Sequence, residues 1–196
     1  MSATATATMA GWRAGSVLRG GCMALCLLGL ALMAKGAMVP LKAAVAQALL
    51  ERAFDRSLAE HRPVKPWPWA DTAPVARISI ERLGVREVVL SGGTGQAMAF
   101  GPTVMPRTTA GVTIMAAHRD THFRFIRDLQ VGDVIRVETV HGTIQRYHVT
   151  GFQTVRWDRF AYDRNPALPR LALTTCWPIE AVRHGPWRRI VWAEAE

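Results

Sequence analysis

The chain has 196 residues, 49% of them hydrophobic, and a formal net charge of +9 at pH 7. This length suits one domain of ordinary size with an appendage and argues against a larger multidomain protein. Four of the 24 basic residues and none of the 15 acidic ones lie in the first 42 positions, so the rest carries a charge of only +5. Because those charges are interspersed and form no basic tract, the composition does not support nucleic-acid binding.

An apolar segment near the N-terminus, residues 20–41, is interrupted by a single charge, Lys35. A bilayer span needs about 20 mostly apolar residues. A lysine side chain near one end can reach the interface. We therefore predict an uncleaved transmembrane anchor over 20–41; a cleaved signal peptide is the competing interpretation.

The charges in front of this segment predict its orientation. Arg13 and Arg19 precede the anchor and no acidic residue does. Basic residues favour the cytoplasmic side of a membrane, so residues 1–19 are expected to form a cytoplasmic tail. The remainder of a single-pass protein with this topology lies outside the inner membrane.

Residues 42–74 are expected to connect the anchor to the globular part. Leu50, Phe54 and Leu58 recur four positions apart, which predicts a juxtamembrane helix that we interpret as a stalk. Four prolines between positions 63 and 74 exclude helix there and favour an extended linker, which also contains tryptophans.

From residue 75 onward the pattern is that of short strands. Alternating or apolar runs are separated by turns rich in Gly, Pro and Asn. Seven or eight such strands with short helices predict a mostly β fold over 75–196, a closed or nearly closed barrel. Gly92–Gly95 lacks the spacing of a nucleotide-binding loop. The expected strands cover 77–80, 83–90, 113–117, 134–139, 143–152, 171–175 and 188–193.

Three of these strands end or begin at residues with complementary chemistry. Cys176 follows one apolar run, His118 ends another, and Arg188 begins a third. A thiol nucleophile, a proton carrier and a fixed cation are the parts needed for acyl transfer through a thioester. Cys176 is also the only cysteine after the anchor, because Cys22 and Cys26 lie within it.

The expected roles follow from the side chains. Cys176 would be the nucleophile, His118 the proton donor and acceptor, and Arg188 the donor to the oxyanion. Neighbours in a strand point to opposite faces, so only one of Arg188 and Arg189 can face the cysteine. Thr175 would support the oxyanion through its hydroxyl or its backbone N–H.

A metal site is a competing interpretation of the histidines. His118 and His122 are four residues apart, as in a helical zinc pair. However, Arg119 stands where a metalloprotease motif has Glu, and the preceding segment is typical of a strand. We therefore expect no metal. His184 is an alternative base.

The segment Leu173–Cys176 resembles the TLxTC signature of sortases, which are membrane-anchored cysteine transpeptidases; Ala172 stands where the signature begins with Thr. His118 and Arg188 fall where that family keeps its histidine and arginine. Over about residues 18–195 the chain is most similar to the proteobacterial, Gram-negative type called class GN. The blocks that resemble this class are Lys42-Ala43, Ala46-Gln47, Ala99–Pro102, His118–Phe125 and Gly185-Pro186.

The resemblance implies a sortase β-barrel in the periplasm, over 75–196, that needs no cofactor. Cys176 would cleave an LPxTG-like signal between Thr and Gly near the C-terminus of an exported protein, and an amine would then accept the acyl part. Asp120, His122 and Trp177 would support the catalytic residues. The alternatives are a thiol hydrolase that releases its product to water and a non-catalytic barrel that binds peptides.

Overall fold

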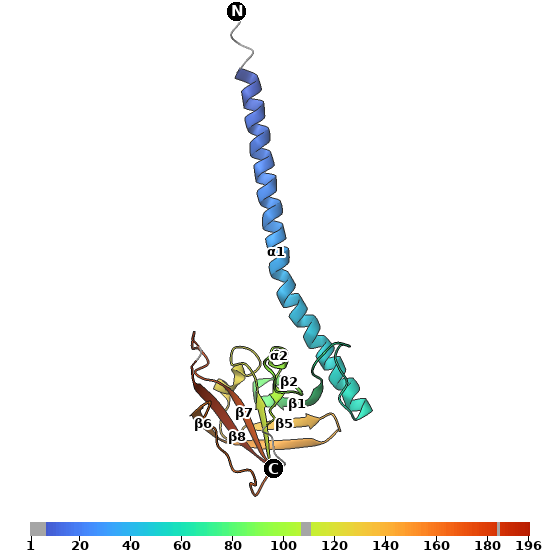
Figure 1. Cartoon of the computed structure of the whole chain (residues 1–196), viewed down its shortest axis with the longest axis vertical. Coiled ribbons are helices and arrows are strands. Elements are labelled where there is room, and N and C mark those ends of the chain that lie inside the picture. The colour runs from blue at the N-terminus through green and yellow to red at the C-terminus, as the bar shows by residue number, and fades with distance from the viewer. Residues whose placement is uncertain (1–6, 107–110, 184) are drawn as a thin grey trace, which may run out of the picture. The chain divides into compact units, whose positions relative to one another are not determined.

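The computed structural model describes residues 7–106, 111–183 and 185–196, with side chains from residue 19 onward (Figure 1). The chain divides into two units, residues 1–45 and 46–196. One helix, α1 (Ala7–Glu60), contributes to both. Its part in the first unit exposes apolar side chains such as Leu25, Leu27 and Leu30, and this long apolar helix is a candidate transmembrane segment.

The second unit contains a closed barrel of eight strands with few and short helices, as predicted (Figure 1). Around the barrel the strands follow the order β1-β2-β3-β4-β7-β8-β6-β5, and β5 pairs with β1 to close it. The strands are β1 (Pro74–Ile80), β2 (Val85–Leu90), β3 (Thr103–Val104), β4 (Val112–Ala116), β5 (Val134–Thr139), β6 (Ile144–Arg156), β7 (Arg170–Cys176) and β8 (Trp187–Ala195). The short helices are η1 (Glu81–Leu83), α2 (Gly95–Met98) and η2 (Arg124–Asp128).

Strand β7 lies between β4 and β8, parallel to the first and antiparallel to the second. Successive side chains of a strand point to opposite faces. Leu171 and Leu173 point into the barrel and are fully buried in its core. Ala172, which alternates with them, packs in a separate cluster with Ile114 of β4 and Ile190 of β8. The interior of the barrel is therefore filled, and the second face of these strands is available for a site.

The C-terminal part of α1 packs against the barrel. Leu50 and Phe54 have 0% exposure and contact Val88 and Leu90 of β2. The guanidinium of Arg77 lies 4.0 Å from the centroid of the Phe54 ring and donates a hydrogen bond to the exposed Asp55 carboxylate. The four-residue spacing in the sequence thus marks a packed face, and residues 46–60 belong to the same unit as the barrel.

Replacing Phe54 with Ala should destabilise the barrel strongly. The change opens a cavity under Arg77, and a buried Phe→Ala substitution costs about 3–5 kcal/mol in free energy of unfolding. Urea unfolding of the full-length protein in detergent, followed by tryptophan fluorescence, measures this loss. The control is Arg52→Ala, an exposed position on the same helix, which should change the unfolding free energy little. Equal stability of the two variants would contradict the packing described above.

Candidate active site

The predicted nucleophile and the predicted arginine lie directly opposite each other. Cys176, the last residue of β7, is the cross-strand partner of Arg188 in β8. Directly opposite residues of an antiparallel pair share one face, with Cβ atoms about 4.5–5.5 Å apart. By alternation, this is the face of Ala172 and Ile190, outside the filled core. Both side chains are partly exposed.

His118 reaches the same place from β4. This strand pairs with β7 up to Ala116 and Thr174, and the Ala117 N–H then donates to the Thr174 carbonyl at 3.3 Å. The chain leaves the sheet at this point, so the imidazole of His118 is exposed. Within the described part of the chain, no hydrogen bond joins it to Cys176. A loose arrangement of this kind is common before substrate binds.

A cavity of about 300 Å³ brings the three side chains together. Its floor is the outer face of β4, β7 and β8, and its walls come from α2, the segment after β3 and the loop between β6 and β7. Most of the walls are apolar, so charges inside it interact more strongly than in water. The lining residues are Met98, Met105, Ile114, Ala116, Ala117, His118, Trp157, Phe160, Thr174, Thr175, Cys176, Arg188 and Ile190.

The two neighbouring arginines of β8 have different surroundings. Arg188 lines the cavity, and its Nη1 donates to the carbonyls of Gly185 (3.2 Å) and Trp187 (2.9 Å). Arg189 donates to the Thr154 hydroxyl at 3.1 Å and lies over aromatic rings away from the cavity. No ion pair to a carboxylate is found for Arg188 among the described residues, so its charge is available to a ligand.

Thr175 is buried, with 3% of its surface exposed. Its hydroxyl donates to the Ala117 carbonyl at 2.8 Å, directly before His118. Because a hydroxyl has one proton to donate, this hydroxyl is committed to the backbone. The side chain of Thr175 therefore links the strand of Cys176 to the segment of His118.

The other residues singled out from the sequence lie outside the cavity lining. His122 bonds through Nδ1 to the Glu87 carboxylate of β2 at 2.8 Å, and Asp120 is exposed and pairs with Arg119 at 3.4 Å. The ring of Trp177 lies under the Arg189 guanidinium. His184 is outside the described residues.

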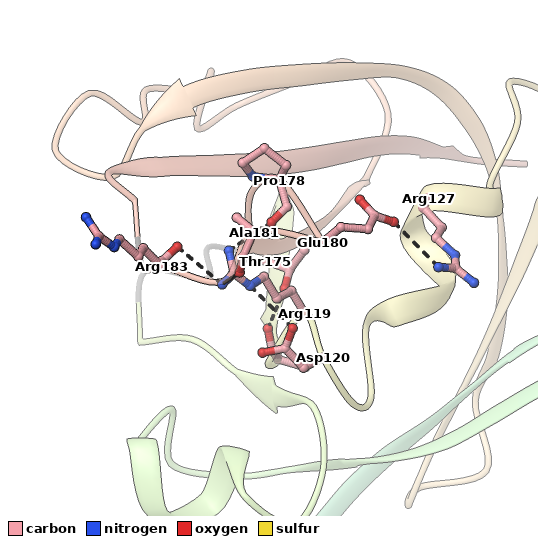
Figure 2. A network of polar contacts seen from close by, with 9 residues as sticks. Arg119, Asp120, Arg127, Thr175, Pro178, Glu180, Ala181 and Arg183 are labelled. Carbon is pink, nitrogen blue, oxygen red and sulfur yellow. Dashed lines mark hydrogen bonds and ion pairs between the residues drawn. The ribbon is translucent and has the colours of Figure 1, made fainter.

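One residue of this region was not predicted. Arg119 has only 4% of its side chain exposed and bonds to the loop between β7 and β8 (Figure 2). Nη1 donates to the Pro178 carbonyl at 2.8 Å, and Nη2 to the carbonyls of Ala181 (2.5 Å) and Arg183 (3.4 Å). Every residue has a backbone carbonyl, so the sequence does not show which carbonyls an arginine will contact. Only the position of Arg119 next to His118 could have drawn attention to it.

The comparisons with known proteins agree with this architecture. The sortase D5 transpeptidase of Clostridium perfringens has a TM-score of 0.61 and 22% identity, over 78% of this chain and 99% of that one. Sortase A from Corynebacterium diphtheriae has a TM-score of 0.57 and 19% identity, over 78% and 85%. Sortase C-1 from Actinomyces oris has a TM-score of 0.55 and 23% identity, over 63% and 74%. At these identities the likeness shows the fold alone.

The sequence comparisons identify the family. A search among curated proteins gives no match. Residues 78–196, more than half of the chain, match the Sortase domain family. Members of this family are generally cysteine transpeptidases that act on exported proteins bearing sorting signals. The chain therefore belongs to the sortase family.

Proposed function

We propose that the protein is a membrane-anchored sortase of class GN that cuts an LPxTG-like signal between Thr and Gly and transfers the acyl part to an amine. The observation that carries the proposal is the meeting of Cys176, His118 and Arg188 around one apolar cavity. The class rests on the sequence blocks around His118 and the loop before Arg188 that resemble this group. No cofactor takes part in the proposed reaction.

In the acylation step, His118 accepts the proton of the Cys176 thiol, and the sulfur bonds to the carbonyl carbon of the substrate Thr. The electron pair of the carbonyl moves to its oxygen, where Arg188 donates hydrogen bonds. When this intermediate collapses, the bond to the Gly nitrogen breaks and His118 returns the proton to the leaving amine. A second amine then attacks the thioester carbonyl carbon, the C–S bond breaks, and His118 carries the proton of the amine to the sulfur, so that an amide and the free Cys176 thiol result.

The surroundings support this division of roles. Arg188 lies across from the nucleophile and has a charge available to the developing oxyanion. The Thr175 side chain supports the oxyanion indirectly, because its hydroxyl holds the backbone before His118 in place. The apolar walls, which include Met105 and Ile190, suit the Leu and Pro side chains of the signal.

The central test is to trap the thioester. Incubation with an LPxTG-like peptide should add the mass of the peptide's N-terminal part to Cys176. An added amine such as hydroxylamine should release a product cut after Thr and capped by that amine, because a water-poor site favours the better nucleophile. Cys176→Ala should form no adduct and His118→Ala very little, with the fold retained in both.

Mass spectrometry of the protein and the peptide measures each step. A product that is only hydrolysed, at a rate independent of amine concentration, would favour the thiol hydrolase. A folded protein that forms no thioester with any peptide of a motif library would favour the peptide-binding barrel.

The two arginines of β8 should differ sharply in the same assay. Arg188→Ala should slow thioester formation by about 10²–10³-fold, the usual cost of an oxyanion donor. Arg189→Ala is the matched control and should retain most of the rate, because its guanidinium contacts Thr154 outside the cavity. Lysine at position 188 should rescue poorly, since an ammonium lacks the planar fork. The opposite ranking of the alanine variants would contradict the roles proposed here.

The proposed location is the inner membrane, with residues 1–19 cytoplasmic, 20–41 spanning the bilayer, 42–74 connecting, and the catalytic domain 75–196 in the periplasm. The apolar exposed face of α1 supports the span. A periplasm-active reporter fused after Glu196 should be active, and the full-length fusion should sediment with membranes. A soluble mature form that begins after Lys35 would refute the anchor.

A further inference from the structure

The loop between β7 and β8, residues 177–186, joins two residues of the proposed site. Cys176 immediately precedes it, and Arg188 follows it within two positions. The Trp177 N–H donates to the Trp187 carbonyl at 3.1 Å, so the base of the loop is closed as in a hairpin. Further out, Ile179 is buried while Val182 is 99% exposed. The first half of the loop thus has an apolar anchor at Ile179, whereas Val182 contributes no buried contact.

Arg119 supports the loop from a different part of the chain. Its guanidinium bonds to three carbonyls along the loop, those of Pro178, Ala181 and Arg183 (Figure 2). The side chain is buried, yet the carboxylate with which it pairs belongs to Asp120, whose side chain is 67% exposed. A buried charge is costly unless it is well hydrogen-bonded. The loop carbonyls therefore satisfy the guanidinium, and the guanidinium in turn holds the loop.

Residues 117–119 also connect the loop to the rest of the proposed site. The Ala117 carbonyl accepts from Thr175, His118 lines the cavity, and Arg119 turns away from it to the loop. At the far end of the loop, Arg188 Nη1 donates to the Gly185 carbonyl at 3.2 Å. The same Nη1 donates to the Trp187 carbonyl of β8 at 2.9 Å, so the strand and the loop each supply one of the two acceptors that orient the Arg188 guanidinium.

We propose that Arg119 is a positioning residue for the acyl transfer: it fixes the 177–186 loop and, through it, aims Arg188 at the carbonyl attacked by Cys176. This inference rests on the proposed function. It assigns Arg119 no contact with the substrate. It requires instead that loss of Arg119 matters because Arg188 loses its orientation.

The loop also contains a natural control. Arg127 of η2 pairs with Glu180 at 3.5 Å, with side chains 39% and 72% exposed (Figure 2). Exposed ion pairs contribute little to stability. Like the Arg119 variant, Arg127→Gln removes an arginine that contacts this loop, but it removes no buried support. Arg119→Gln should slow thioester formation by about 10²-fold, the scale of a misplaced catalytic group, whereas Arg127→Gln should stay within about threefold of wild type.

A double-mutant cycle separates positioning from a general structural role. In full-length protein in detergent, thioester formation is measured for wild type, Arg119→Gln, Arg188→Ala and the double variant. If Arg119 acts through Arg188, its loss should cost little once Arg188 is gone, so the two effects should be far from additive. Alkylation of Cys176 by iodoacetamide, which needs no oxyanion donor, should change by less than about threefold in every variant. Additive losses, or an Arg119→Gln rate equal to wild type, would overturn the proposal.

Two further arms keep the result interpretable. If Arg119→Gln does not fold, Arg119→Lys takes its place; it keeps the buried charge but not the fork, and a wild-type rate for it would overturn the proposal. If wild type itself forms no thioester, the proposed function fails, and hydrogen exchange still tests the loop. The backbone amides of residues 179–183 should then exchange faster in the Arg119 variant than in wild type and Arg127→Gln, with β7 and β8 unchanged. Equal exchange would show that Arg119 does not hold the loop.

Discussion

The placement of the site depends on the register of β7. Leu171 and Leu173 are fully buried in the barrel, and their burial determines which face of the strand points inward. A shift of one residue would move every side chain of the strand to the other face. Cys176 would then turn to the side now taken by Thr175, and its opposition to Arg188 would be lost. The packing of the apolar core thus places Cys176 and Arg188 on the outside of the barrel.

Two strands that are distant from each other in the sequence, β4 and β8, bring the other residues of the proposed site to the end of β7. The parallel pairing with β4 brings His118 to the end of β7, and the antiparallel pairing with β8 brings Arg188. The aromatic side chains of Phe160 and Trp192 stack beside this face, at 5.9 Å between ring centroids. A sheet face alone would be open to water. The loops that cover it make a cavity in which a fixed guanidinium can stabilise charge more strongly than in solvent.

The sequence was sufficient for the fold, because period-two runs predicted the barrel that the structure contains. The strand ends pointed to Cys176 and His118, whose catalytic roles stay predictions. Alternation showed that only one of Arg188 and Arg189 could face the cysteine, and the pairing of β7 with β8 places Arg188 opposite it. The sequence pattern did not predict the hydrogen bond from Thr175 to the backbone before His118, nor the bonds from the Arg119 guanidinium to the loop carbonyls. These bonds join a side chain to carbonyls about 60 residues away, and carbonyl positions depend on the completed fold.

The buried Arg119 guanidinium bonds to backbone carbonyls, and these bring no net negative charge into the site. A buried carboxylate in the place of these carbonyls would add a negative charge to the loop between Cys176 and Arg188 and would oppose the build-up of negative charge in the proposed reaction. The acids near the cavity are outside its lining: Asp120 is exposed and pairs with Arg119, Glu87 pairs with His122, and the Arg156 guanidinium lowers the pKa of Asp158 by donating a hydrogen bond to it. No carboxylate lines the cavity among the residues that the structure describes. Among the described residues that line the cavity, no anion offsets the charge of Arg188, and this favours the oxyanion role proposed for its guanidinium.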